Sequence, residues 1–229
     1  MPVTARFPEA VLWDMDGTII DSEPYWMEAE GALVERFGGT WSHEQGERMV
    51  GNGLETTAAI LQEAGVDLPV PAIVDWLDAY VQDRLAEELP LRPGAVELLT
   101  ELRDAGVPCA LVTMSYEGMA RRVAAALPEG VFAEVVAGDN VDRPKPFPDA
   151  YELAARRLGV DVSRCVAFED SVPGLTSAVA SGAVAVGIPF LADLDLVEGG
   201  LRWATLEGVT LERLRALEPV LETSGEVAR

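Results

Sequence analysis

Hydrophobic and polar positions follow a regular alternation from about Pro93 onward. Short apolar runs predict buried strands, and the amphipathic segments between them predict helices of about 10 to 15 residues. The predicted strands lie at 107–113, 131–137, 165–168 and 183–188. One predicted helix runs from Pro93-Gly94 to Ala105-Gly106, and the others cover 116–127, 150–158, 172–181 and about 206–217. This alternation predicts a parallel sheet covered by helices on both faces.

Residues from about Ile20 to Leu89 interrupt this alternation. Apolar side chains recur there at helical spacing, and no stretch has the pattern of a strand. We therefore expect a small helical insert at residues 20–89, placed directly after the first predicted strand. Its expected hinges are Asp21-Ser22-Glu23-Pro24 and Leu89-Pro90-Leu91-Arg92-Pro93.

Length and composition fit a soluble globular protein. The 229 residues suffice for one α/β domain with a smaller insert, and 49% of them are hydrophobic. A formal net charge of −22 repels nucleic acids and anionic membranes, so we expect neither as a partner. No apolar run reaches about 18 residues, and the first residues lack the pattern of a signal peptide. Cys109 and Cys165 lie in apolar runs, which predicts buried thiols and a cytoplasmic protein.

His43 is the chain's one histidine, and two cysteines with one histidine do not make a zinc site. The residue follows Ser42, which suits a helix N-cap, so we expect His43 at the surface. No Gly-x-Ser-x-Gly motif accompanies it. These observations argue against serine-hydrolase chemistry.

The most informative motif follows the first predicted strand, Ala10-Val11-Leu12-Trp13. Asp14 and Asp16 stand two residues apart there, and Gly17 allows the backbone to turn sharply. A pair of acids at a strand end suits a site that holds a hard metal ion beside a nucleophilic carboxylate. Acids also cap helices and fill turns, so this motif alone leaves a structural role open.

Three later strand ends carry chemistry that complements these acids. Thr113 and Ser115 follow one predicted strand, Lys145 lies in the proline-rich loop after the next, and Glu169-Asp170 follow the third. Because ligands bind beyond the carboxyl ends of the strands in open parallel sheets, we expect these residues to converge. Each has an ordinary alternative as a strand end, a surface lysine or a helix N-cap, but the ordered set favours one site.

The chemistry that suits this set is phosphoryl transfer through a covalent aspartyl phosphate. Asp14 is the candidate nucleophile. Asp16 is placed to protonate the leaving oxygen and later to deprotonate the attacking water. Thr113 would offer its hydroxyl to the phosphate, and Lys145 would supply a positive charge.

Mg²⁺ is the expected cofactor. A carboxylate attacks phosphorus only where the repulsion between the two anions is offset, and a bound Mg²⁺ does this while neutralising charge on the transferring oxygens. We expect Asp170, with Glu169 beside or behind it, to complete the metal site that begins at Asp14.

The motifs resemble those of the haloacid dehalogenase-like hydrolase superfamily, and the resemblance covers essentially the whole chain. It rests on Asp14-Met15-Asp16-Gly17-Thr18, on Thr113 with Ser115, on Lys145-Pro146-Phe147-Pro148-Asp149, and on Glu169-Asp170-Ser171. The resemblance implies an α/β fold with a Rossmann-like, doubly wound parallel sheet core. That core would comprise residues 1–19 and 90–229, with a small inserted α-helical cap domain at 20–89.

The same resemblance implies site roles. It makes Asp14 the nucleophile and Asp16 the acid and base of a Mg²⁺-dependent reaction. It also implies that the backbone carbonyl of Asp16 and the side chains of Asp14 and Asp170 bind the metal.

Within the superfamily, Asp21-Ser22-Glu23-Pro24-Tyr25-Trp26 is typical of the phosphatases grouped with β-phosphoglucomutase. Dehalogenases of the superfamily lack the second acid, which is present here as Asp16. The mutases carry a hinge histidine where this chain has Trp26, and a cap arginine in the region of residues 51–54. We therefore expect a phosphatase that hydrolyses a small phosphomonoester such as a sugar phosphate. A phosphomutase and a non-catalytic binding module on the same fold are the alternatives.

Cap residues are expected to set specificity, because the core residues act on the phosphoryl group. The substrate-binding candidates are Tyr25, Trp26, Arg48, Met49 and Asn52 of the insert, with Met114, Ser115 and Tyr116 facing them from the core. A solvated helix face is the alternative for Arg48. The expected partner is a small phosphorylated metabolite, and we expect a monomer or a weak homodimer.

Overall fold

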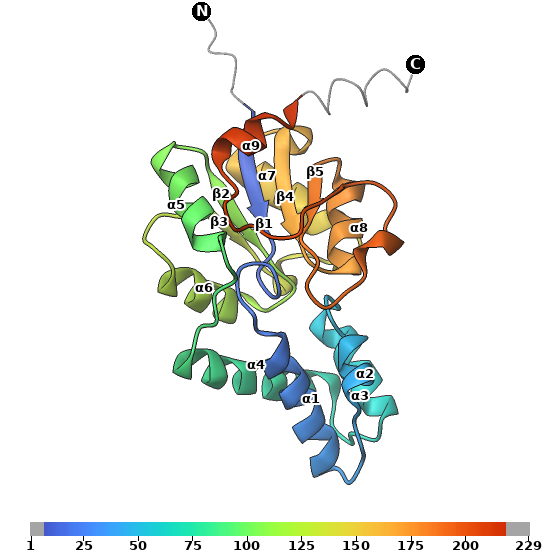
Figure 1. Cartoon of the computed structure of the whole chain (residues 1–229). Helices are drawn as coiled ribbons and strands as arrows, with labels where there is room; N and C mark the ends of the chain where they lie inside the picture. The colour runs from blue at the N-terminus through green and yellow to red at the C-terminus, as the bar shows by residue number, and fades with distance from the viewer. Residues whose placement is uncertain (1–6, 219–229) are drawn as a thin grey trace, which may run out of the picture.

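The computed structural model describes residues 7–218, which form a six-stranded parallel sheet flanked by helices (Figure 1). The sheet order is β3-β2-β1-β4-β5-β6. Its strands are β1 (Ala10–Trp13), β2 (Cys109–Val112), β3 (Glu134–Val136), β4 (Cys165–Glu169), β5 (Val184–Gly187) and β6 (Leu201–Arg202). The predicted parallel α/β fold is confirmed, and β1 lies at its centre between β2 and β4.

The strands form because their apolar runs are buried on both faces. Every residue of β1, β2, β4 and β5 is buried. Since side chains alternate along a strand, Ala10 and Leu12 pack with the core on one face, and Val11 and Trp13 pack with the core on the other. This two-sided burial explains why the strand sequences are continuous apolar runs rather than alternating ones.

Two helix layers cover the sheet. Helices α7 (Asp149–Leu158) and α8 (Val172–Ser181) pack on the face that carries Leu12. Helices α5 (Ala95–Asp104), α6 (Glu117–Ala126) and α9 (Leu211–Arg215) pack on the face that carries Trp13. Short 3-10 turns lie at η1 (Gly138–Asn140), η2 (Val162–Arg164) and η3 (Leu194–Leu196). The layers leave the carboxyl edge of the sheet open to the remaining helices.

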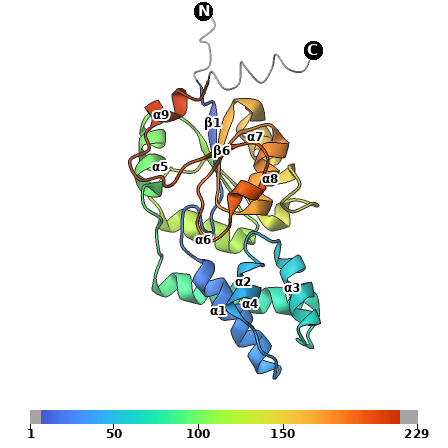
Figure 2. The same ribbon diagram turned by 45° about the vertical axis from the view of Figure 1, so that its right-hand side comes forward.

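Helices α1 (Glu23–Arg36), α2 (His43–Glu47), α3 (Leu54–Glu63) and α4 (Val70–Glu87) gather at that carboxyl edge, apart from the two layers (Figures 1 and 2). They have apolar contacts of their own, through Leu33, Leu61, Ile73 and Leu77. We call residues 20–89 the cap and the rest the core. These boundaries stay a prediction. The predicted core also includes residues 1–6 and 219–229, which lie outside the described residues.

Both connections between cap and core run side by side. Ile20 pairs with Leu91 in an antiparallel bridge. On either side of it the Asp21 N–H donates to the Pro90 carbonyl at 2.7 Å, and the Arg92 N–H donates to that of Ile19 at 2.8 Å. The cap therefore enters and leaves the core at one point, next to the end of β1.

The structure differs from the sequence expectations at the end of the chain. The last helix begins at Leu211 rather than near 206, because Thr210 caps it by accepting from the Arg213 N–H and Leu206–Val209 forms a turn instead. Strand β6 was not predicted, because it has only two residues and no apolar run marks it in the sequence. Both cysteine thiols are buried and free, as predicted. Across residues 7–218, no helix combines the length and the apolar character that a membrane crossing requires.

Candidate active site

The acids predicted to start the site lie just beyond the end of β1, where the cap faces the sheet (Figure 1). The Asp14 N–H donates to the Phe168 carbonyl at 3.1 Å, which extends the ladder between β1 and β4 by one residue. The chain then turns tightly, since the N–H groups of Ile19 and Ile20 both donate to the Met15 carbonyl. Asp14 thus continues the ladder of β1, and Asp16 lies in the turn that follows.

Lys145 connects two of the buried acids. Its Nζ donates to Asp14 Oδ1 and to Glu169 Oε1, each at 2.6 Å, and to the Val112 carbonyl at 3.0 Å. The residue is 4% exposed. Burial lowers the pKa of Lys145, but the Asp14 and Glu169 carboxylates outweigh it and raise the pKa above its usual value. Lys145 therefore stays charged, with all three of its donors used.

Glu169 lies behind this ion pair and is fully bonded. Its Oε1 accepts from the Tyr151 hydroxyl at 2.7 Å as well as from Lys145. Its Oε2 accepts from the Asp170 N–H at 3.2 Å and from the Ser171 hydroxyl at 3.2 Å. Helix α8 starts close by, and a Cβ on Gly174 would lie 2.0 Å from both carboxylate oxygens. Both carboxylate oxygens of Glu169 therefore accept from protein donors, and one of these donors is Lys145.

Asp14, Glu169 and Asp170 form the group of carboxylates that is able to hold a metal ion. One oxygen of each lies within 4.8 Å of the others, and all three residues are buried. Asp14 Oδ2 and Asp170 Oδ2 have no hydrogen-bond partner within residues 7–218. Burial, together with Glu169, raises the pKa of Asp14 to about 8, and burial with Asp14 raises that of Asp170 well above its usual value. A divalent cation with a preference for oxygen would satisfy these two atoms and offset the crowded negative charge.

Gly17 makes this arrangement possible. Its φ of +80° lies in the left-handed region that favours glycine. A Cβ there would lie 2.0 Å from Asp170 Oδ2. The glycine of the first motif is thus required by the close approach of the β1 turn to the Asp170 carboxylate.

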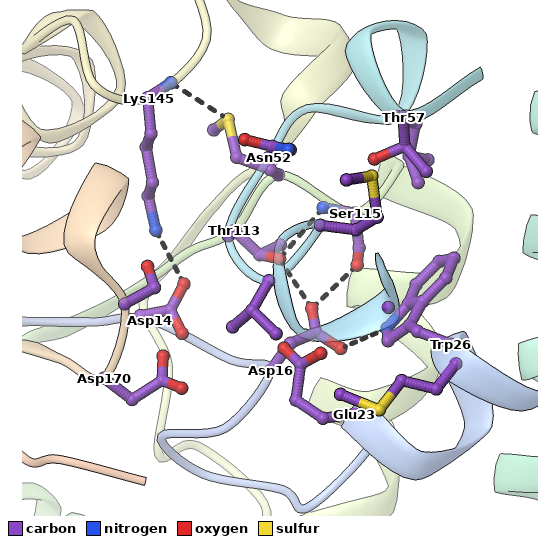
Figure 3. A pocket seen from close by; sticks show the side chains of 18 of the residues that line it. Asp14, Asp16, Glu23, Trp26, Asn52, Thr57, Thr113, Ser115, Lys145 and Asp170 are labelled. Atoms are coloured by element: carbon purple, nitrogen blue, oxygen red, sulfur yellow. Dashed lines mark hydrogen bonds and ion pairs between the residues drawn. The ribbon is translucent and has the colours of Figure 1, made fainter. Parts of the chain in front are cut away.

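Asp16 is held by four donors and lies apart from the group around Lys145 (Figure 3). Its Oδ2 accepts from the Ser115 hydroxyl at 2.8 Å and the Thr113 hydroxyl at 3.2 Å. Its Oδ1 accepts from the Ser22 hydroxyl at 2.5 Å and the Trp26 indole N–H at 3.1 Å. Core and cap each supply two of these donors, so Asp16 stands at the boundary between them.

A pocket opens between this boundary and the cap. Among the predicted substrate-binding residues, Trp26, Met49, Asn52, Met114 and Ser115 line it. The predicted catalytic residues Asp14, Asp16, Thr113 and Lys145, and the predicted metal ligand Asp170, line it as well. The structure thus brings the motifs of four strand ends and the first cap helix to one cavity.

Three of the predicted residues lie elsewhere. The ring of Tyr25 faces the guanidinium of Arg84, 5.1 Å from its centroid. Arg48 pairs with Glu44 at 2.6 Å on an exposed helix face, which is the alternative considered for it. The hydroxyl of Tyr116 donates to Glu55 of α3 at 2.6 Å and so joins core to cap. His43 is exposed, as predicted, and lies 3.3 Å from Glu47.

Several residues of the pocket and its support are not among the residues predicted from the sequence. Glu23, Met27 and Glu30 of α1 line the pocket, and Ser22 and Tyr151 hold Asp16 and Glu169. The spacing of 23, 26–27 and 30 does place these side chains on one face of a helix. What the spacing does not give is which partner that face contacts.

Comparisons with known proteins agree on one family. A model of the haloacid dehalogenase-like hydrolase family matches residues 8–182. Protein CbbY of Cereibacter sphaeroides is 33% identical over 187 residues, which is 76% of this chain and 81% of that protein. Hexitol phosphatase A of Escherichia coli (strain K12) is 30% identical over 211 residues, 85% of this chain and 92% of that protein.

A solved structure extends the similarity to the fold as a whole. The crystal structure of a variant of CbbY from Rhodobacter sphaeroides, in complex with xylulose-(1,5)bisphosphate, matches with a TM-score of 0.81 and 27% identity. The match covers 90% of this chain and 98% of that one. The similarity therefore includes the helices at the carboxyl edge as well as the sheet.

Proposed function

This chain belongs to the haloacid dehalogenase-like hydrolases and is a phosphoric monoester hydrolase, and we propose that it cleaves small sugar or polyol phosphates through an aspartyl phosphate on Asp14. Hexitol phosphatase A, a phosphatase by name, matches over most of both chains and supports this assignment. The substrate is then a small phosphorylated metabolite.

Two balanced steps describe the proposed reaction. In the first, a carboxylate oxygen of Asp14 bonds to phosphorus, the bond from phosphorus to the leaving oxygen breaks, and Asp16 gives that oxygen a proton. In the second, water bonds to phosphorus and loses a proton to Asp16. The bond from phosphorus to Asp14 then breaks and releases inorganic phosphate.

The contacts of Asp16 support its role in both steps. Its carboxylate is fixed by four donors, so it has little freedom to rotate away from a bound ester. Thr113 and Ser115, which hold one of its oxygens, also line the pocket beside Lys145. A fixed acid in the same pocket as a cation suits proton transfer to an oxygen that leaves a phosphoryl group.

Mg²⁺ is the proposed cofactor, held by Asp14 and Asp170 with the backbone carbonyl of Asp16. The unpartnered, buried oxygens on Asp14 and Asp170 fit a hard divalent cation. When bound, the ion would offset the repulsion between the Asp14 carboxylate and the phosphate. Glu169 has both oxygens bonded to protein donors, so we assign it to the support of Lys145 rather than to the metal.

One observation carries the proposal: the paired Asp14 and Lys145 lie in the same pocket as the separately held Asp16. The experiment that tests it is phosphate release from sugar phosphates and p-nitrophenyl phosphate, with Mg²⁺ and with EDTA. We expect release with Mg²⁺, loss with EDTA, and loss of about 10⁴-fold or more in Asp14→Asn. Asp67→Asn, an exposed cap residue, is the matched control and should keep full activity. Full activity in Asp14→Asn would refute the mechanism.

A further inference from the structure

Among the described residues, the cap side of the pocket carries two acidic side chains and no basic one. Glu23 and Glu30 of α1 line the pocket. Of the described residues that line it, Lys145 alone is cationic, and its three donors are used by Asp14, Glu169 and the Val112 carbonyl. Any group that extends from the phosphate toward the cap therefore meets carboxyl oxygens that accept hydrogen bonds, and it meets no free cation.

Glu23 is buried without a protein partner. The residue is 5% exposed and begins α1, and its carboxylate has no hydrogen bond within residues 7–218. Figure 3 shows it beside Asp16, on the side where Trp26 lies. An acid buried in this way is costly to keep unless a ligand completes its hydrogen bonds. Its position next to the proposed proton donor puts it within the space of the leaving group.

Glu30 lies two helical turns further on the same face of α1. The residue is 3% exposed, and its Oε2 accepts from the indole N–H of Trp41 at 3.3 Å. Its second oxygen has no hydrogen bond within the described chain. Trp41 thus fixes the carboxyl group while one acceptor remains for a ligand.

Apolar side chains also line the pocket with the two acids. They belong to Trp26, Met27, Met49 and Leu54, and Thr57 adds a hydroxyl group. Carbon chains pack on such walls, and carboxyl oxygens accept hydrogen bonds from hydroxyl groups. A second phosphate or a carboxylate on the substrate would instead face two acids without a free cation.

We infer that Glu23 and Glu30 select an uncharged, hydroxyl-bearing leaving group, a polyol or a sugar, and reject substrates that carry a second anionic group. This inference rests on the proposed phosphatase function and names the substrate class of the same site. The hydroxyls donate to the two carboxyl groups, and the carbon chain lies against the apolar wall. A site built to bond hydroxyl groups discriminates strongly, because its polar atoms stay unpaired with the wrong ligand.

Matched substrate pairs test it on the unaltered protein with Mg²⁺. Glycerol 3-phosphate and 3-phosphoglycerate differ by a hydroxymethyl group against a carboxylate, and glucose 6-phosphate and glucose 1,6-bisphosphate differ by one phosphate. We expect kcat/KM to be about 100-fold higher for the uncharged member of each pair. Equal or higher kcat/KM for the anionic members, with p-nitrophenyl phosphate hydrolysed, would overturn this inference alone. Release from no substrate, p-nitrophenyl phosphate included, would overturn the proposed function and this inference with it.

Two variants tie the selectivity to the acids. In Glu30→Gln and in Glu23→Gln we expect the ratio of kcat/KM between the members of each pair to fall by about tenfold, mainly through KM. Glu35→Gln, an exposed position on the same helix, is the matched control and should keep the ratio. A ratio that is the same in Glu30→Gln and Glu35→Gln would contradict the assignment of Glu30, whether or not Glu23→Gln folds.

Discussion

The core residues and the cap residues of the pocket, which we call its core wall and its cap wall, differ in how far their polar groups are satisfied by protein partners. On the core wall, Lys145 uses every donor and Glu169 every oxygen. Asp14 and Asp170, the two residues proposed for a metal, each keep one carboxylate oxygen without a hydrogen-bond partner in the described part of the chain. On the cap wall, among residues 7–218, the Glu23 carboxyl group has no hydrogen-bond partner and that of Glu30 has one. The core wall is therefore complete except for its ion, and the cap wall is completed by the substrate. A satisfied charge network, as on the core wall, suits a reaction step that is the same for every substrate. Unpaired hydrogen-bond acceptors, as on the cap wall, suit discrimination between substrates.

Removing the cation should break the core wall most severely. Lys145→Met leaves Asp14 and Glu169 buried without their counter-charge, which we expect to cost about 3–5 kcal/mol of unfolding free energy. Phosphate release should fall by about 10³-fold or more, since the charge that holds Asp14 is lost. Urea unfolding and single-substrate kinetics measure the two effects.

Arg143→Met, two residues earlier, is the control for that loss. Arg143 pairs with Asp149 at 2.8 Å, and more than half of its side chain is exposed. Surface pairs of this kind contribute about 0–1 kcal/mol. Similar losses in the two variants would show that the Lys145 network is not special to the site.

A second comparison separates backbone strain from damage to the metal site. Gly17 and Gly38 have nearly the same left-handed φ, +80° and +79°. A Cβ on Gly17 would meet Asp170 Oδ2 at 2.0 Å, whereas a Cβ on Gly38 would meet nothing within 4 Å. We expect Gly38→Ala to lose about 1 kcal/mol of stability with unchanged kinetics. Gly17→Ala should lose about 100-fold in kcat and bind Mg²⁺ more weakly by calorimetry. Equal activity in the two variants would remove the steric argument.

We expect a smaller loss of activity from a change at the boundary between the two walls, where Trp26 bonds to Asp16. Trp26→Phe keeps the ring in the pocket but removes the N–H that donates to Asp16 at 3.1 Å. A hydrogen bond to a charged group contributes about 1.5–3 kcal/mol, so we expect kcat to fall about tenfold on every substrate. Trp76→Phe, on α4 against Tyr80, is the control and should change nothing. A loss confined to one substrate would assign Trp26 to recognition instead.

The smallest expected effect is the contribution of Glu30, on the cap wall, to the pH dependence of the free energy of unfolding. Burial raises the pKa of Glu30 from 4.5 to about 8, although the Trp41 N–H opposes the rise. Between these values the folded protein keeps a proton that the unfolded chain has lost, so the free energy of unfolding falls as pH rises through this window. Glu30→Gln removes that dependence, and its stability relative to the wild type should increase from about pH 5 to about pH 8.

Urea unfolding at three pH values without Mg²⁺ measures this difference. The exposed Glu35→Gln should follow the wild type at each pH. A Glu30→Gln curve parallel to that of the wild type across the window would show that Glu30 ionises in the folded protein at its ordinary pH.

The sequence predicted the core wall well because its chemistry lies at strand ends. An apolar run followed by a polar residue marks where a buried parallel strand stops, and all such stops meet at one edge. Asp14, Thr113, Lys145 and Asp170 were found by this argument, and the structure brings them to one cavity. Helix α8 was also predicted to the residue, because Ser171 caps its start and Gly182 follows its end in the left-handed region.

The cap wall was harder to predict, because its residues act through packing rather than position in a motif. Glu30 fits the helical spacing of α1, but its burial depends on how α1 meets α2 and the core. Tyr151 likewise belongs to an ordinary amphipathic helix, and the partner of its hydroxyl is Glu169 on a strand. Arg48 had the right charge for an anion but lies on the exposed face of its helix turn, paired with Glu44. Local patterns do not record such contacts.

The adjacent hinge segments have a consequence for how such a protein changes over time. With Ile20 bridged to Leu91, the cap is attached to the core as one surface excursion whose two ends nearly touch. Segments with neighbouring ends can be lengthened, shortened or exchanged without disturbing the chain on which they sit. Of the contacts that fix the Asp14 centre, those of Lys145 and Glu169 lie wholly outside the cap. The cap can therefore be exchanged as one segment during evolution, which changes the metabolite that is bound and keeps the Lys145 and Glu169 contacts around Asp14. Such an exchange has to keep donors equivalent to Ser22 and Trp26 for Asp16.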